Sequence, residues 1–200
     1  MIQLSVANYI PNLYLKRIYS GVPKYVKVNA LSLNLGEEMS AAVFGYRTFT
    51  GCDSVSSFVG RGKISSLKVL KKDPRVRACF AQLGESWEMS NELFNDLNRS
   101  TCLLYVHNTE CTSTNDLWYE IFRQKNGKGQ SGQLPPCEDV LYLHAKRTNY
   151  QAGIWRRCLQ RSPAVPNPDG HGWEINDRCI QVSRMSGLPA PEAISRIFFM

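Results

Sequence analysis

Apolar residues recur every three or four positions over most of the chain, which is the period of an amphipathic helix. This pattern predicts one helix over Glu37–Phe49 and another from Ile64 to Lys72. Two further helix predictions are strengthened by residues that favour a helix start, Pro74 and Ser90. The remaining helices are predicted over Arg75–Leu83, Asn91–Val106, Asp116–Lys125, Glu138 to about Gln160, and Glu192–Phe199.

Strand patterns are fewer and shorter. Apolar and polar residues alternate over Ile2–Ala7 and again over Lys24–Ala30, which predicts two strands. Between them, residues 8–21 fit either a loop or a short helix. Near the carboxyl end, Gly172–Ser183 predicts a hairpin that turns near Asn176 and Asp177. The expected fold class is therefore mainly α with a small β component.

Composition is that of a folded protein, with 43% hydrophobic and 20% charged residues in 200. Charges such as Lys16 and Arg17 interrupt every apolar run before it reaches membrane-spanning length, and the first twenty residues lack a signal-peptide order. Seven cysteines without a framework spacing favour a reducing compartment, and Cys79, Cys102 and Cys158 fall on apolar helical faces. We expect a soluble, intracellular protein with no membrane contact.

The net charge of +7 is concentrated in one stretch. Between Arg61 and Arg77 the only acidic residue is Asp73. Such a cluster favours a polyanionic partner, because phosphate contacts dominate the affinity of basic proteins for nucleic acid. Its basic residues are Arg61, Lys63, Lys68, Lys71, Lys72, Arg75 and Arg77.

A glycine-hinged segment lies just before this cluster. Gly51-Cys52-Asp53 follows the predicted helix over Glu37–Phe49, and Gly60-Arg61-Gly62-Lys63 precedes the next one. Glycines at a helix start let backbone N–H groups approach a phosphate closely. The layout of helix, two glycine turns and helix resembles the helix–two-turn–helix segment of the flap endonuclease/XPG-type 5′-nucleases, which belong to the PIN-like fold.

That resemblance implies specific roles. Asp53 matches the aspartate at the metal site, which would hold Mg²⁺ if a complete domain is formed. Gly60, Gly62 and Lys63 match the turn that grips the backbone of duplex DNA, helped by a monovalent cation. Longer phrases, QLPPCEDVLYLHAKRTNYQAGIWRRCLQ and VPNPDGHGWEI, are similar to a group of uncharacterised, often transposon-associated animal proteins.

The resemblance also implies a domain organisation. Residues 1–73 would form the C-terminal part of an α/β 5′-nuclease domain, with the helix–two-turn–helix at about 37–72. Residues 74–162 would form a helical domain. A linker containing Pro163, Pro166 and Pro168 would then lead to the hairpin and the terminal helix over residues 163–200. The chain is thus expected to begin partway through the nuclease fold.

Metal-assisted cleavage requires several carboxylates around two divalent ions about 4 Å apart. Asp53 is a single candidate, so we expect no cleavage by this polypeptide alone. Zinc is not expected either, because Cys137 and His144 lie two helical turns apart and the chain has no C-x-x-C pair.

Two hypotheses for function follow. In the first, the protein binds a DNA backbone without reading sequence, through Gly60, Arg61, Gly62, Lys63, Lys68, Lys71 and Lys72, and is nuclear. In the second, the helices form a scaffold or protein-interaction module that carries a relic nuclease-like segment. Basic residues of the predicted helix from Glu138 fit either a solvated surface or a second nucleic-acid contact: Lys146, Arg147, Arg156, Arg157 and Arg161.

Overall fold

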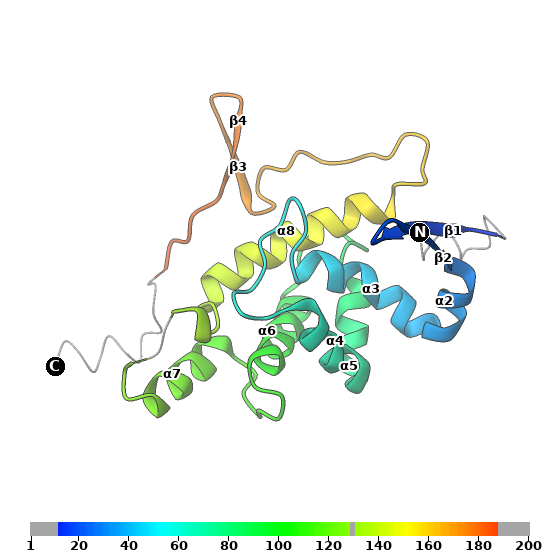
Figure 1. Cartoon of the computed structure of the whole chain (residues 1–200). Coiled ribbons are helices and arrows are strands. Elements are labelled where there is room, and N and C mark those ends of the chain that lie inside the picture. The colour runs from blue at the N-terminus through cyan, green and yellow to red at the C-terminus, as the bar shows by residue number, and fades with distance from the viewer. Residues whose placement is uncertain (1–11, 129–130, 188–200) are drawn as a thin grey trace.

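The helices pack together as the body of the protein, and two β-ribbons project from it (Figure 1). The structure is a computed structural model that describes residues 12–128 and 131–187. The predicted strand over 2–7 and helix over 192–199 lie outside these residues. The elements are β1 Tyr14–Tyr19, β2 Val22–Lys27, α2 Val28–Leu35, α3 Glu37–Phe49, α4 Lys63–Lys72, α5 Pro74–Gln82, α6 Asn91–Tyr105, α7 Thr114–Gln124, η1 Ser131–Gln133, α8 Glu138–Arg156, β3 Trp173–Asn176 and β4 Cys179–Val182. The expectation of a mainly helical fold with a small β component is confirmed.

The first ribbon pairs β1 and β2 antiparallel. Ser20 and Gly21 at its turn have φ angles of 49° and 78°, the left-handed conformation that a two-residue hairpin needs. The predicted strand over Lys24–Ala30 begins two residues too late and ends three too late, since β2 is Val22–Lys27 and residues 28–30 belong to α2. The N–H of Val28 donates to the carbonyl of Leu13 at 2.9 Å, and α2 begins there because Val28 is buried on the body.

The hydrophobic core lies between α3, α4, α5, α6 and α8. Its largest fully buried side chains include Phe49, Phe80, Leu70, Leu97 and Leu141, one from each of these helices. The core therefore continues across the boundary expected between residues 73 and 74. At that point Asp73 caps α5, accepting hydrogen bonds from the N–H groups of Arg75 and Val76.

Close contact between α3 and α5 depends on Gly45. A Cβ atom at this position would lie 2.1 Å from the carbonyl oxygen of Phe80 and 2.9 Å from the Cβ of Leu83. Both neighbours belong to the rigid, buried core, so a larger residue at position 45 would force the helices apart.

Two arginines at the end of α8 are used internally. Arg156 donates to the carbonyls of Ala81, in the last turn of α5, and of Leu83, just after it, and Arg157 donates to those of Gly84 and Glu85. Cations are favourable beside the unsatisfied carbonyls of a helix C-terminus. Burial lowers the pKa of Arg156. The helix ends at Arg156, four residues before the predicted end at Gln160, and Arg157 is its C-cap residue.

The second ribbon, β3–β4, turns at Asp177 and Arg178, close to the predicted point, with φ angles of 49° and 65°. Arg147 of α8 anchors its base by donating to the carbonyl of Gly172 at 3.1 Å. His171 is buried there, its ring 5.0 Å from that of Tyr150. The β3–β4 ribbon is therefore tied to α8 at one end.

In the described part of the chain, none of the helices combines the length and apolarity that crossing a membrane requires. All seven cysteines lie in that part, and all are free. Burial of Cys79 and Cys102 agrees with their predicted positions and raises the pKa of each thiol to about 12. Cys158 is exposed, contrary to prediction, because α8 has already ended.

Replacing Gly45 with alanine is expected to lower the free energy of unfolding by about 1–3 kcal/mol, since overpacking at a buried contact costs this much. Ala41→Ser on the exposed side of α3 is the control and should change stability by less than about 0.5 kcal/mol. Urea unfolding followed by circular dichroism measures both. Equal stability of the two variants would contradict the close α3–α5 contact.

Candidate nucleic-acid interface

The loop from Thr50 to Gly62 joins α3 to α4 and is held to the body by apolar side chains. Val55 is buried. The ring of Phe58 lies 5.2 Å from that of Phe49 and 4.9 Å from that of His144. At its start, Gly51 has a φ of 104°, and a Cβ there would lie 2.6 Å from the Cβ of Ser57. The loop therefore has one packed conformation that fixes where α4 begins.

His144 links this loop to α8. Its Nε2 lies 2.9 Å from the carbonyl oxygen of Phe49, and its Nδ1 lies 3.3 Å from the hydroxyl oxygen of Ser56. Because a carbonyl only accepts, Nε2 carries the proton and Nδ1 accepts from Ser56. Burial lowers the pKa of His144 to about 4, so the imidazole is neutral at pH 7.

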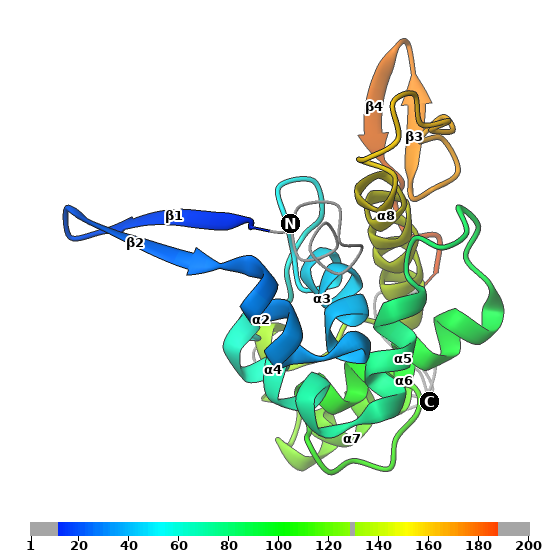
Figure 2. The ribbon, with the colours of Figure 1, turned by 90° about the vertical axis from the view of Figure 1, so that its right-hand side faces the viewer.

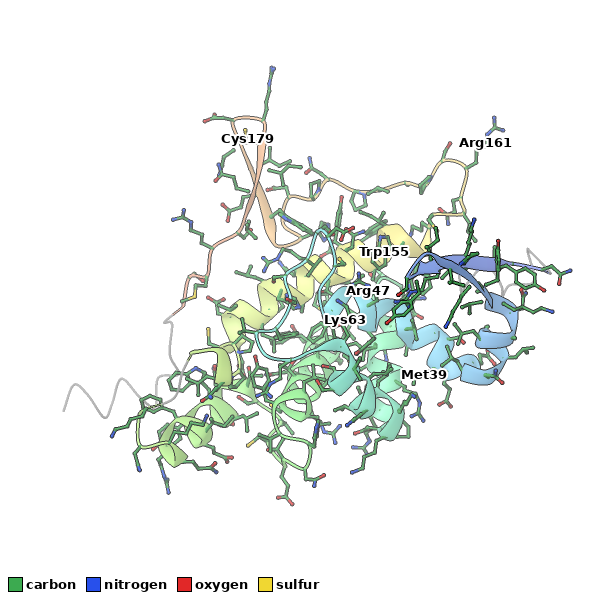
Figure 3. The ribbon with its side chains drawn as sticks, viewed as in Figure 1. Met39, Arg47, Lys63, Trp155, Arg161 and Cys179 are labelled. Carbon is green, nitrogen blue, oxygen red and sulfur yellow. The ribbon has the colours of Figure 1, made fainter. Side chains whose placement is uncertain are left out.

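Two cationic side chains converge on the carbonyl of Gly51. The guanidinium of Arg47 donates to this oxygen, and the ammonium of Lys63 donates to it at 2.8 Å. Figure 3 shows Arg47 and Lys63 close together beside the end of α3. Tyr46 in turn donates its hydroxyl hydrogen to the carbonyl of Lys63. Lys63 is thus partly occupied by its own loop.

Asp53 is exposed in the same loop. It shares a shallow depression with Arg47, Lys63, Cys52 and Ser56. In residues 12–128 and 131–187, no group of three or more His, Cys, Asp or Glu side chains is arranged to hold a metal ion. Asp53 therefore lies beside two cationic side chains, without the further carboxylates that a pair of divalent ions requires.

The residues of the second glycine turn differ in what they require. Gly60 has a φ of 69°, which favours glycine. Gly62 has a φ of −67° and precedes α4, where a Cβ would meet nothing within 4 Å. Arg61 places its guanidinium 4.4 Å from the ring centroid of Tyr105, and its buried Nε has no hydrogen-bond partner among the described residues.

The monovalent cation implied by the resemblance would be bound by carbonyl oxygens. Near this turn the Gly62 carbonyl accepts from the hydroxyls of Ser65 and Ser66, and the Phe58 carbonyl accepts from the N–H of Arg61. The carbonyl of Gly51 already receives two cationic donors.

The exposed lysines of α4 lie on two sides of the helix. Lys71 borders a depression beside the start of α3, together with Arg77, Glu37 and Glu38. Arg77 pairs there with Glu38 at 3.2 Å. Lys68 and Lys72 border a different groove, between α4 and the end of α6. The fold therefore divides the cluster seen in the sequence.

This second groove, the α4–α6 groove, has a volume of about 560 Å³. Its one carboxylate belongs to Asp73, which caps α5 through one oxygen and lies 3.6 Å from Arg99 through the other. Lys68 and Lys72 make no ion pair within the described residues. The groove is lined by Lys68, Val69, Lys72, Asp73, Pro74, Leu103, His107, Asn108 and Thr109.

Sequence reasoning placed Lys68 and Lys72 in the interface but missed the other wall of the groove. His107, Asn108 and Thr109 follow α6 and lie far from α4 in the sequence. Their polar character after a helix end was the available signal, and it does not show which helix they face. His144 was also missed as an anchor, although it lies next to the apolar position Ala145.

Comparison of the chain with protein-family models, curated proteins and solved structures gives no significant match.

Acidification is expected to destabilise the protein through His144. The unfolded chain binds a proton on this residue near pH 6.5, whereas the folded chain does so only near pH 4. Stability is therefore unaffected by His144 above pH 6.5 and falls between pH 6.5 and 4, by on the order of 3 kcal/mol.

Urea unfolding at a series of pH values measures this loss. His144→Gln retains an N–H donor for the Phe49 carbonyl but does not titrate, so its stability should fall less between pH 6.5 and 4 than that of the native chain. Parallel pH profiles for the two proteins would exclude this role of His144.

Proposed function

We propose that this protein binds the backbone of duplex DNA, without reading its sequence, through the α4–α6 groove and the start of α4. The observation that supports this most directly is the charge of the groove. Lys68 and Lys72 line an open groove whose only carboxylate is already engaged by Arg99 and the α5 cap.

Phosphate recognition fits the other groups present. Lys68 and Lys72 lie one helical turn apart, and Asn108 and Thr109 add polar side chains across the groove. The first turn of α4 carries no acidic residue and starts at the open Gly62. Contacts of this kind position a duplex without distinguishing base pairs.

Kinship with the 5′-nucleases remains part of this proposal. Two features support it: the order helix, glycine-hinged loop, helix, and the position of Lys63 at the start of α4. Asp53 has cations for neighbours where that family needs carboxylates, so the proposal includes binding and no cleavage. A DNA ligand would place the protein in the nucleus.

A second candidate function is protein interaction. An apolar groove lies beside the β1–β2 ribbon and is lined mainly by Leu15, Val26, Phe44 and Trp155. Such a surface suits a protein partner. Added salt separates the two candidates, because DNA binding weakens with salt while apolar contacts do not.

Lys68→Gln/Lys72→Gln is expected to reduce the salt dependence of duplex binding. Loss of two phosphate contacts should lower the slope of log K against log salt by about 2. Fluorescence anisotropy of a labelled blunt duplex, titrated at several salt concentrations, measures this slope.

The matched control is Arg123→Gln/Lys128→Gln, which removes the same charge from exposed positions at the end of α7. It should leave the slope within about 0.5 of the native value. An equal change in both variants would mean that net charge alone, and not the groove, attracts the duplex.

Gly62→Ala tests whether the backbone at the start of α4 approaches a phosphate. The structure has room for the added methyl group, so the variant should fold. Duplex binding should nevertheless weaken at least about fivefold, because the methyl group would separate the N–H groups from the ligand. Unchanged affinity would confine the interface to the groove.

A further inference from the structure

The β1–β2 ribbon stands away from the helices as a separate projection (Figure 2). Every residue of its two strands is exposed. Isolated two-stranded ribbons are only marginally stable in water. The exposed side chains of this ribbon are therefore candidates for contact with a ligand.

The register of the strands defines two faces. Residues opposite each other share a face, and successive residues alternate between faces. One face contains the pairs Leu15–Val26, Arg17–Lys24 and Tyr19–Val22. Leu15 and Val26 border the apolar groove next to Phe44 and Trp155, so this face is turned toward the body. Trp155 is labelled in Figure 3, at the end of α8 nearest the ribbon.

The outer face contains the other three pairs: Tyr14–Lys27, Lys16–Tyr25 and Ile18–Pro23. Each tyrosine thus lies opposite a lysine. In the first pair the tyrosine belongs to β1, and in the next pair it belongs to β2. Tyr14 and Tyr25 are 52% and 63% exposed. Within the described residues neither ring contacts another ring or a cation.

Charge on the ribbon has one sign. Residues 12–36 contain Lys16, Arg17, Lys24 and Lys27 and no acidic residue. None of these four makes an ion pair in the part of the chain that the structure describes. The ribbon therefore complements a polyanion.

We propose that the outer face of the β1–β2 ribbon binds single-stranded nucleic acid. Bases would stack on Tyr14 and Tyr25, which are diagonal neighbours about 7–8 Å apart on the sheet, while Lys16 and Lys27 contact the adjoining phosphates. Flat aromatic rings on a sheet surface are a common platform for unpaired bases.

An unpaired strand fits this face better than two other polyanions. In a duplex the bases are stacked on each other and cannot cover the tyrosine rings. An anionic membrane would be entered by the tip, where Ile18, Tyr19 and Val22 are exposed beyond the cations. It would leave the rings of Tyr14 and Tyr25, each level with a lysine, uncovered.

This site goes beyond the function proposed above. It lies on a different element from the α4–α6 groove, takes a different form of nucleic acid and does not depend on that groove. The two proposals can therefore fail separately.

The test is fluorescence anisotropy of labelled oligothymidylate with the full chain. Tyr14→Ala and Tyr25→Ala should each weaken binding at least about fivefold, whereas the corresponding Phe variants should restore it. Tyr19→Ala is the matched control, since Tyr19 is 63% exposed on the inner face of the same ribbon. Lys16→Gln/Lys27→Gln should lower the salt slope by about 1.4.

Three results would overturn the proposal: an equal loss for Tyr19→Ala, no rescue by phenylalanine, or a loss in the alanine variants confined to binding of phosphatidylcholine–phosphatidylserine vesicles.

Lys68→Gln/Lys72→Gln is measured beside them with oligothymidylate and with duplex. If only duplex binding is found and it depends on these two lysines, the ribbon site is excluded and the groove stands. The reverse pattern excludes the groove and leaves the ribbon.

Discussion

One hydrogen bond, from the buried imidazole of His144 to the carbonyl of Phe49, joins α8 to the end of α3. The carbonyl belongs to the last turn of α3, which would otherwise be left without a partner in an apolar region. Phe58 packs on the same imidazole, so the bond also determines the path of the loop. The start of α4, and with it the position of Lys63, therefore depends on a residue 81 positions further along the chain.

Part of the positive charge in this protein is used internally. Arg147, Arg156 and Arg157 donate to backbone carbonyls and hold loops and helix ends to α8. Lys146 does the same at Gly170, and Arg161, the last basic residue of this region, is exposed. Arginine suits the internal role because its planar donors satisfy several acceptors at once. The exposed charges include lysines on α4 and on the first ribbon.

Helices were the most predictable part of the fold. Periodic apolar residues together with Pro74 and Ser90 located α5 and α6 to within a residue or so. The first ribbon was harder: alternation located β2 in part, whereas β1 lies in residues that fitted a loop or a short helix, and its side chains are exposed on both faces. Gly51 and Gly60 were correctly picked out as turn residues, since both have positive φ angles, whereas Gly62 adopts a conformation open to other residues. Which lysines share a groove could not be predicted, because the opposite wall comes from the end of α6.

The electrostatic potential near the end of the first ribbon is set mainly by the ribbon's own charges, because the ribbon extends away from the helices (Figure 2). Arg17 and Lys24 face each other three residues beyond the base of the ribbon, or about 10 Å along the strands. Ionic screening in physiological salt acts over about 8 Å. A ligand near these two residues is thus influenced by the ribbon's cations and hardly by Glu37, Glu38 or the other acidic groups of the helices. The ribbon would attract a polyanion to nearly the same extent whatever the net charge of the rest of the molecule.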